Sequence, residues 1–378
     1  MIVDKPDWVS HGGPIFSLDI HPEGVRFATG GEDHKVRIWG MGPVLSKKEE
    51  GDADVPKILA TLVDHFGPVN VVRWSRDGRF IASGSDDKII IITELRPGGG
   101  QATFGSTDTP NVENWKALHS LRSHKSNVTD VAWSVGDAMI ASCSVDNEVI
   151  IWDPATEQPI VKLRGHTGMV KGVSWDPVGN YLVSQSDDKS VIIWKVDGWS
   201  MVRRVTGPYT KSVGATFFLR LCWTPDGSGV VTTNSYGEGS HTAAVLSRGE
   251  WERTNDFVGH KGPVLVGRFN PRPFRGEKGA LCFLVALGSQ DNTITVWSTA
   301  SPRPLVVLKS FFASSVVDLA WTPDGRTLLA ASLDGSVARF TLEGAELGAE
   351  MATEEEFERH MRKVYGDLRG RNTTIAES

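Results

Sequence analysis

The stretch SQSDDKSVIIW, residues 184–194, joins a polar turn to a strand and decides the fold. Two aspartates and a lysine precede a run of β-branched residues that ends in tryptophan. Aspartate favours turns, and β-branched residues favour strands. The aspartate six residues before the tryptophan could be a catalytic acid at a strand end or a structural element of the fold. The rest of the chain distinguishes these two interpretations.

The same spacing recurs along the chain. Aspartate precedes tryptophan by six residues in units that end at Trp39, Trp152, Trp194 and Trp297. A histidine lies 22 residues before the aspartate in the units that begin at His11, His65, His124 and His166. In a further unit His260 lies 31 residues before Asp291, because a charged insertion intervenes. Sequence similarity at a fixed period is the signature of a repeat architecture.

Seven units fit this pattern, and they start near residues 11, 65, 124, 166, 214, 260 and 312. Each unit contains short strands bounded by turns, which is the WD-repeat signature. The sequence therefore predicts an all-β, seven-bladed WD-repeat β-propeller over residues 1–343. An open ring would expose a strand edge, so we expect residues 2–9 to supply the fourth strand of the seventh blade.

Within the units we expect buried hydrogen-bonded sets, because a buried carboxylate is tolerated only when it is fully paired. The expected members are His11, Thr29, Asp33 and Trp39; His65, Ser83 and Asp87; His124, Ser142, Asp146 and Trp152; His166, Ser184, Asp188 and Trp194; and His260, Asp291 and Trp297. A Ser-His-Asp hydrolase triad is the alternative. A motif that recurs in several units indicates a structural role, since active sites are few in a protein.

Composition narrows the function classes. The net charge of −6 argues against electrostatically driven nucleic-acid binding by the whole domain. No stretch approaches the roughly 20 apolar residues of a membrane span, and the N-terminus does not resemble a secretory signal. Three widely separated cysteines indicate a reducing, intracellular compartment. No motif suggests a nucleophile or a metal site, so we expect no enzyme activity, no metal and no cofactor.

Several segments depart from the repeat. Residues 41–57 and 97–115 are charged or glycine-rich insertions that we expect to be loops. The fifth unit lacks the His, Ser and Asp markers but keeps its apolar alternation, which predicts a blade held by packing. Residues 344–378 are expected to form a C-terminal extension, part helical and part disordered. Thr353 and Glu356 fit a capping box at the start of its short helix.

Particular strings, among them RFATGGEDHKVRIW, PNVENWK and TFFLRLCWTPDG, resemble the N-terminal propeller of the HIRA/Hir histone chaperone family. The resemblance covers essentially the whole chain, including the degenerate fifth unit. It implies a nuclear interaction scaffold that supports replication-independent nucleosome assembly and transcriptional regulation. The implied partners are a ubinuclein/Hpc-type subunit, other subunits of the chaperone complex and, indirectly, core histones, with no sequence-specific nucleic acid and no membrane.

Two alternatives remain. The WD subunit of the replication-coupled chromatin assembly factor shares the VENW insertion. A WD peptide reader or ubiquitin-ligase substrate adaptor is the other, and it would bind isolated peptides tightly.

The partner could bind on the face that carries the Asp turns and the His loops. Residues directly before the Asp, or five after the His, are expected to project there: Glu32, Asp86 and Asp187, and Phe16, Asn70 and Lys171. The three acids could receive a basic peptide. Alternatively, they are scattered solvated charges that contribute little.

Overall fold

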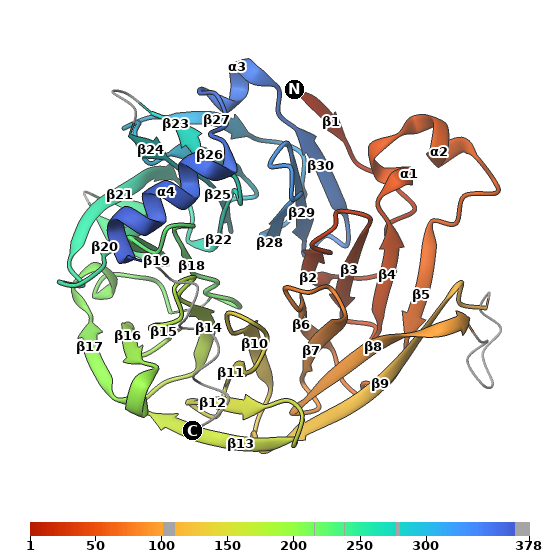
Figure 1. Cartoon of the computed structure of the whole chain (residues 1–378), viewed down its shortest axis with the longest axis horizontal. Coiled ribbons are helices and arrows are strands. Elements are labelled where there is room, and N and C mark those ends of the chain that lie inside the picture. The colour runs from red at the N-terminus through yellow and green to blue at the C-terminus, as the bar shows by residue number, and fades with distance from the viewer. Residues whose placement is uncertain (101–109, 215, 238, 277–279, 367–378) are drawn as a thin grey trace.

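Seven four-stranded antiparallel sheets are arranged in a closed ring in the computed structural model of the chain (Figure 1). The structure describes residues 1–100, 110–214, 216–237, 239–276 and 280–366. Each sheet is one blade. The strands nearest the central axis are β2, β6, β10, β14, β18, β22 and β28 (Figure 1). The predicted seven-bladed propeller is confirmed.

The strands of each blade follow in chain order, apart from the last blade. Blades 1 and 2 contain β2 (Ile15–Ile20), β3 (Arg26–Gly31), β4 (Val36–Gly40) and β5 (Ile58–Leu62), then β6 (Val69–Trp74), β7 (Phe80–Ser85), β8 (Ile89–Gly99) and β9 (Glu113–Arg122). Blades 3 and 4 contain β10 (Val128–Trp133), β11 (Ile140–Ser144), β12 (Glu148–Asp153) and β13 (Gln158–Arg164), then β14 (Val170–Trp175), β15 (Tyr181–Ser186), β16 (Ser190–Lys195) and β17 (Met201–Val205). Blades 5 and 6 contain β18 (Cys222–Trp223), β19 (Gly229–Gly237), β20 (Ser240–Ser247) and β21 (Arg253–His260), then β22 (Val264–Phe269), β25 (Leu284–Ser289), β26 (Ile294–Ser298) and β27 (Pro304–Leu308).

Blade 7 closes the ring with a strand from the other end of the chain. It contains β28 (Val316–Trp321), β29 (Thr327–Ser332), β30 (Val337–Thr341) and the N-terminal β1 (Ile2–Asp4). Ile2 pairs with Thr341, and Val3 pairs with Phe340. The predicted closure by the N-terminal strand is confirmed, and β1 covers the edge of β30 that would otherwise be free to pair with another chain.

The tryptophans that follow the His positions tie neighbouring blades together. Each donates its indole N–H to a backbone carbonyl of the preceding blade, at 3.0–3.3 Å: Trp74 to Asp19, Trp133 to Arg73, Trp175 to Ala132, Trp223 to Ser174 and Trp321 to Arg268. The ring carbons of these residues are buried with aliphatic side chains between the sheets. The periodic tryptophans therefore satisfy their one donor while they fill the space between blades.

The prediction of a loop at residues 41–57 is wrong in part. Two short helices, α1 (Gly42–Leu45) and α2 (Lys47–Gly51), form there. Ser46 caps α2 by accepting a hydrogen bond from the backbone N–H of Glu49. The indole N–H of Trp8 donates to Glu50 at 2.8 Å, which holds the insertion against the N-terminal segment.

The prediction of a loop over residues 97–115 is wrong at its two ends, which form strands, whereas residues 101–109 lie outside the described part of the chain. The two ends of this insertion extend β8 and β9 beyond the other strands. Glu113 forms an ion pair with Arg26 at 2.6 Å, and Trp115 packs edge-on against Trp74. Asn111 accepts a hydrogen bond from the backbone of Thr61 in β5. The insertion therefore fastens blade 2 to the outer edge of blade 1.

After blade 7 the chain forms α3 (Gly344–Leu347) and then α4 (Glu354–Tyr365). The capping box of Thr353 and Glu356 is present, and the predicted C-terminal helix is confirmed. The α4 helix lies on blades 5 and 6, where His360 contacts Asp226 at 3.1 Å and Phe357 packs against Phe283. Residues 367–378, where disorder was expected, lie outside the described residues. A domain boundary at residue 343 stays a prediction.

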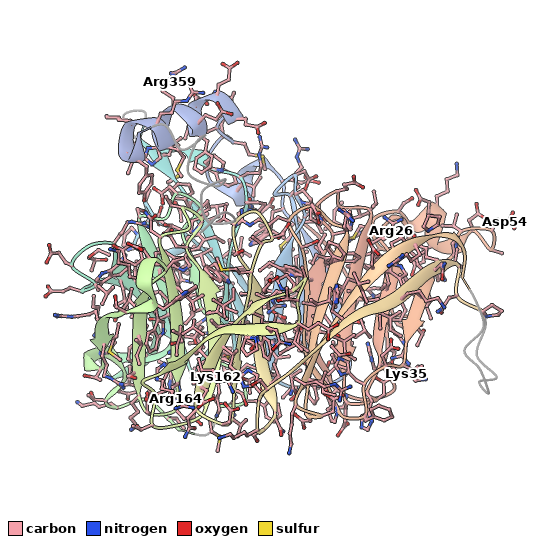
Figure 2. The ribbon with its side chains drawn as sticks, turned by 60° about the horizontal axis from the view of Figure 1, so that its bottom comes forward. Arg26, Lys35, Asp54, Lys162, Arg164 and Arg359 are labelled. Carbon is pink, nitrogen blue, oxygen red and sulfur yellow. The ribbon has the colours of Figure 1, made fainter. Side chains whose placement is uncertain are left out.

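The two faces of the ring are distinct. We call the face that carries α4 the helix face, and the opposite face, with the turns of Asp33, Asp87, Asp146, Asp188, Asp291 and Asp334, the Asp-turn face. Figure 2 shows Arg359 of α4 on one side of the molecule and Lys35 and Arg164 on the other. A two-stranded hairpin, β23 (Phe274–Arg275) and β24 (Leu281–Cys282), interrupts blade 6 and contacts the α4 region through the ion pair of Arg275 with Glu356.

Candidate functional site

The His and Asp residues of blade 4 form a linear set of hydrogen bonds. Trp194 donates its indole N–H to Ser184 Oγ at 2.9 Å, and Ser184 Oγ lies 2.8 Å from His166 Nε2. His166 Nδ1 lies 2.9 Å from Asp188, which also accepts the backbone N–H of Thr167. A neutral imidazole protonated at Nδ1 satisfies every one of these bonds. The set ties the loop before β14 to the turn after β15.

The same arrangement recurs in blades 1 to 3, one set per blade. The imidazole bridges a carboxylate and a hydroxyl at 2.7–2.9 Å in each: His11 with Asp33 and Thr29, His65 with Asp87 and Ser83, and His124 with Asp146 and Ser142. Trp39 and Trp152 complete two of the sets, and blade 2 has Thr93 in the tryptophan position. The histidines are buried in separate blades, so they do not share a cleft.

Blade 6 builds its set with a different hydroxyl. His260 Nε2 lies 2.9 Å from Thr295 Oγ1, which also accepts the indole N–H of Trp297 at 2.8 Å. Leu287 stands where blades 1 to 5 carry Ser or Thr. His260 Nδ1 lies 2.9 Å from Thr293 and 3.4 Å from Asp291. The sequence pattern missed Thr295 because this hydroxyl comes from β26, two residues before the tryptophan, and not from the preceding strand.

Blade 5 is a correction to the sequence analysis. The hydroxyl marker is not lost, because Thr232 lies 18 residues after Gly214, at the spacing of the other units. Tyr209 donates its phenolic hydroxyl to Thr232 Oγ1 at 2.6 Å, and both side chains are buried. The tyrosine thus takes the place of the histidine from a position five residues earlier in the chain.

The sets hold their carboxylates ionised. Burial alone would raise the pKa of Asp33, but the hydrogen bond from His11 and the nearby charge of Arg37 outweigh it and lower the pKa to about 2. The pKa of Asp146 is also lowered to about 2, since the hydrogen bond from His124 outweighs burial. Burial lowers the pKa of His11, which keeps its imidazole neutral. A carboxylate whose pKa is lowered in the folded state stabilises the fold at neutral pH.

A cluster of charged residues fills the central axis, and the sequence analysis missed it. Asp318 has no exposed surface, and three guanidinium groups surround it: Arg73 at 2.8 Å, Arg268 at 3.1 Å and Arg220 at 3.2 Å. Ser17 also donates its hydroxyl to Asp318 at 2.7 Å. These partners outweigh burial and hold the pKa of Asp318 well below its usual range.

Arg220 links several blades at once. Its guanidinium donates to the carbonyls of Phe16 and Val317, both at 2.7 Å, and to that of Asn70 at 2.5 Å. The cation comes from the degenerate blade 5 and reaches blades 7, 1 and 2 across the axis. A spacing signal could have found the cluster: charges stand six residues after the His slot at Asp130, Arg220 and Asp318, and eight after it at Asp19, Arg73 and Arg268.

The six residues suggested for partner binding do not behave alike. Glu32 is exposed on the Asp-turn face. Asp86 accepts a hydrogen bond from Asn70 at 2.7 Å, and Asp187 forms an ion pair with Lys171 at 2.5 Å. Asn70 and Lys171 are buried against the ring, and Phe16 is only 8% exposed. The accessible part of this group therefore consists of the three acids, two of which already have a partner.

Two phenylalanines on the same face were not singled out from the sequence. Phe66, directly after His65, is 86% exposed. Phe217 is 54% exposed and stacks on Phe16 with ring centroids 5.6 Å apart. The sequence does contain a signal for Phe66, because it is a large apolar residue at the position directly after the His. In four other blades that position is small or polar: Gly12, Lys125, Thr167 and Lys261.

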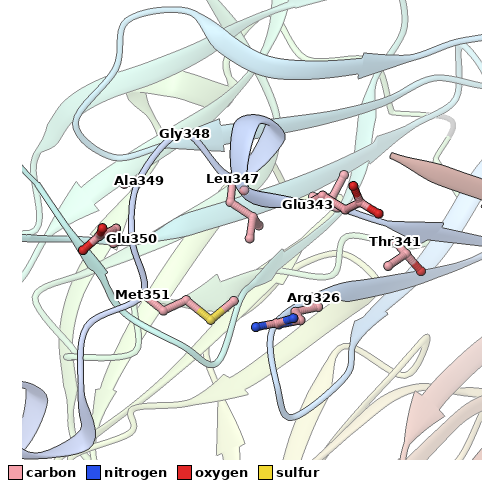
Figure 3. A pocket seen from close by; sticks show the side chains of 10 residues that line it. Arg326, Thr341, Glu343, Leu347, Gly348, Ala349, Glu350 and Met351 are labelled. Atoms are coloured by element: carbon pink, nitrogen blue, oxygen red, sulfur yellow. The ribbon is translucent and has the colours of Figure 1, made fainter.

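A cavity of about 660 Å³ lies beside α3 and the turn before β29. Figure 3 shows the Arg326 and Met351 side chains extending toward each other in this cavity, with Leu347 beside them. No group of three or more His, Cys, Asp or Glu in the described ranges could hold a metal ion. None of the helices that the structure describes has the length and apolar character needed to cross a membrane.

Comparison with known proteins gives consistent results. A family model described as the CAF1B/HIR1 β-propeller domain matches residues 1–212, and a WD-domain model matches residues 304–338. A protein named HIRA from Oryza sativa subsp. japonica is 50% identical over the whole of this chain. HIRA from Mus musculus is 46% identical over 96% of the chain, and HIR1 from Cryptococcus neoformans is 44% identical over 92%. The chain covers 41%, 37% and 40% of these relatives, about two fifths of their length.

Proposed function

Because this chain belongs to the CAF1B/HIR1 β-propeller family, we propose that it is a non-enzymatic interaction scaffold of a HIRA-type histone chaperone complex. It would support replication-independent nucleosome assembly and transcriptional regulation in the nucleus. Its direct partner would be a ubinuclein/Hpc-type subunit, and core histones would be reached through other subunits.

The observation that carries this proposal is the extent of the similarity to HIRA proteins. It runs over the whole chain, and so includes blade 5, which has replaced its His set with the Tyr209–Thr232 pair. The arrangement of the His–Asp pairs supports a non-enzymatic role. In blades 1 to 4 each pair is hydrogen-bonded within its own blade. A closed ring whose His–Asp pairs are used within single blades is suited to present surfaces to other proteins.

We place the docking site for the ubinuclein-type subunit on the Asp-turn face. Glu32, Asp86 and Asp187 stand at equivalent turns of blades 1, 2 and 4 and could pair with basic side chains of the partner. Such contacts set orientation and association rate more than raw affinity. The exposed rings of Phe66 and Phe217 would add apolar area between them.

Affinity purification of the tagged chain from nuclear extract tests the assignment. We expect a ubinuclein-like subunit among the recovered proteins, whereas recovery of ubiquitin-ligase components would contradict the proposal. Binding of the purified subunit then tests the face. Glu32→Lys combined with Asp86→Lys should weaken binding roughly tenfold at low salt, because charge repulsion replaces attraction.

Asp54→Lys provides a matched control. Asp54 is exposed in the insertion after blade 1's third strand, away from the Asp turns (Figure 2). This variant should bind the subunit as the unmodified chain does. Equal affinity of the double variant and the control would exclude the Asp-turn face, while leaving the choice of partner intact.

A second candidate follows from the breadth of the family model, whose description includes CAF1B as well as HIR1. In that case the chain would serve the replication-coupled chromatin assembly factor. The same purification distinguishes the two, because other subunits of that factor would be recovered in place of a ubinuclein-like subunit.

A further inference from the structure

A small apolar pocket lies between blades 2 and 3 and has a volume of about 260 Å³. Phe80, Ile92 and Leu118 line it from blade 2, and Trp133 and Pro154 line it from blade 3. The rings of Phe80 and Trp133 stack with centroids 6.2 Å apart. Trp133 donates its indole N–H inward to the carbonyl of Arg73, so the ring presents carbon to the pocket.

The pocket is separate from the contacts described above. Its lining includes residues of the turns after β10 and β12, which face the same side of the ring as α4. The α4 helix packs on blades 5 and 6, and Figure 1 shows it across the ring from β8 and β12. The Asp turns lie on the opposite face. Any ligand here would leave the proposed ubinuclein site free.

The rim of the pocket is acidic. Asp137 and Asp153 line it, and the lining contains no lysine or arginine. Asp137 accepts the backbone N–H groups of Arg76 and Asp77 at 2.9 and 3.0 Å, and Asp153 accepts that of Ala155 at 2.9 Å. These bonds fix the two carboxylates in place, and neither forms an ion pair with another described residue.

The neighbouring charges cancel the rim only in part. Arg76 lies close enough to Asp137 to interact electrostatically with its carboxylate, and the described residues show no such partner for Asp153. Arg79 stacks over the ring of Phe80 at 5.0 Å, but it forms an ion pair with Glu94 at 3.2 Å. Glu157 adds a third carboxylate beside His119, which lines the pocket, with 2.9 Å between the carboxylate and the imidazole. Carboxylates around an apolar pocket complement a segment in which a basic side chain lies next to an apolar one.

We infer that this pocket docks an extended basic segment of a partner protein. One aliphatic or aromatic side chain would enter the pocket between Phe80 and Trp133, and flanking Lys or Arg residues would pair with Asp137 and Asp153. The volume is smaller than the roughly 300–1,000 Å³ of typical small-molecule sites, and this favours a single side chain over a cofactor. The inference goes beyond the proposed function, because it assigns a second docking site on another part of the ring.

A synthetic peptide tests the site directly. The probe is a fluorescein-labelled nine-residue peptide, Gly-Lys-Gly-Lys-Phe-Lys-Gly-Lys-Gly, titrated by fluorescence anisotropy at low ionic strength. We expect saturable binding that weakens at least tenfold when the central Phe is replaced by Gly. Replacement of the four lysines by glutamate should abolish it.

A pocket-filling substitution localises the binding. Ala155 is exposed at the pocket rim, so Ala155→Trp should fill the hollow without disturbing the core. Ala300 occupies the equivalent turn position of blade 6, three residues after Trp297 as Ala155 is after Trp152, and it is also exposed. Ala155→Trp should weaken peptide binding at least tenfold, and Ala300→Trp should leave it unchanged.

Asp153→Asn keeps the acceptor for the Ala155 N–H and removes the charge, and should weaken binding several-fold in a salt-dependent manner. Circular dichroism and thermal unfolding of each variant establish that it is folded. Equal peptide affinity of Ala155→Trp and Ala300→Trp would overturn the inference, as would a wild-type chain that binds the Phe and Gly peptides equally or binds neither.

Discussion

Blades 4 and 7 hold the loop before their inner strand in different ways, by hydrogen bonds in blade 4 and by apolar packing in blade 7. In blade 4, His166, Ser184 and Trp194 form a chain of hydrogen bonds that ends on Asp188. In blade 7 the three corresponding positions are apolar and buried at 6%, 0% and 0% exposure: Phe312, Ala330 and Phe340. These side chains belong to one hydrophobic cluster, into which Phe311 also packs. The sheets themselves have the same order and pairing.

The comparison indicates that the His, hydroxyl and Trp positions change together, all hydrogen-bonding in blade 4 and all apolar in blade 7. A buried donor without an acceptor costs about 1–3 kcal/mol, whereas removal of all partners together can be nearly neutral. Asp334 survives in blade 7 without a histidine, and it accepts the backbone N–H groups of Ala313 and Ser336 at 2.8 and 3.0 Å. The aspartate therefore has a turn-capping role that is separable from its pairing with an imidazole.

Blade 5 lies between these two solutions. It keeps the hydroxyl of Thr232 but supplies its partner from Tyr209, and Tyr236 stands in the Asp position. The ring of Tyr236 packs edge-on against His241. One phenol–hydroxyl bond is a complete pair, so the reduced set leaves no donor unsatisfied.

Loss of the acid should have its largest effect in blade 4. Asp188→Ala removes the acceptor for His166, for the Thr167 N–H and for Ser190, and should lower the free energy of unfolding by about 1–3 kcal/mol. Asp334→Ala, which strands no imidazole, should cost roughly half as much. Urea unfolding midpoints at pH 7 measure both. Equal losses would mean that the histidine adds nothing to the turn.

Substitution of a histidine without its hydroxyl partner into blade 7 should have the next largest effect on the free energy of unfolding. Phe312→His can pair with Asp334 but directs its second ring nitrogen at Ala330, and it should cost about 1–2 kcal/mol. Addition of Ala330→Ser supplies the missing hydroxyl and should recover part of that loss. A double-mutant cycle on unfolding free energies measures the coupling. Additive effects would contradict the all-or-none view of the set.

The smallest expected effect is a change in acid sensitivity. The pKa of Asp146 is about 2 in the folded chain and about 3.9 when unfolded, so its contribution is complete above pH 4 and is lost as the pH falls toward 2. Asp146→Asn should be less stable than wild type at pH 7, and the difference should narrow over that window. Thermal unfolding at pH 7, 4 and 2.5 measures it. A difference that stays constant with pH would show that Asp146 is not the titrating group.

Much of the fold followed from spacing, because each unit repeats its turns and strands within a short stretch of chain. The hydrogen-bonding partners of blades 1 to 4 lie at fixed offsets, such as 22 residues from His124 to Asp146. The same spacing therefore predicted the partners in all four blades. The spacing failed to predict a partner that came from a different strand, as with Thr295 in blade 6, or from outside the unit, as with Tyr209 in blade 5. The candidate interface was harder to predict, because exposure is not periodic: Asn70 and Lys171 follow the repeat and are nevertheless buried.

The sequence by itself determined the number of blades, their strand order, the closure by the N-terminal segment and the His–Asp sets, since all of these depend on residues close in the chain or on one recurring spacing. Only the tertiary structure decided what meets across the ring. Arg220 reaches Phe16, 204 residues away, and Asp318 gathers arginines from three blades. The apolar pocket between blades 2 and 3 has the same origin. Contacts of this kind depend on how the blades are packed around the axis. The axial charges recur at fixed offsets from the His slots, but that spacing does not determine which of them pair across the ring.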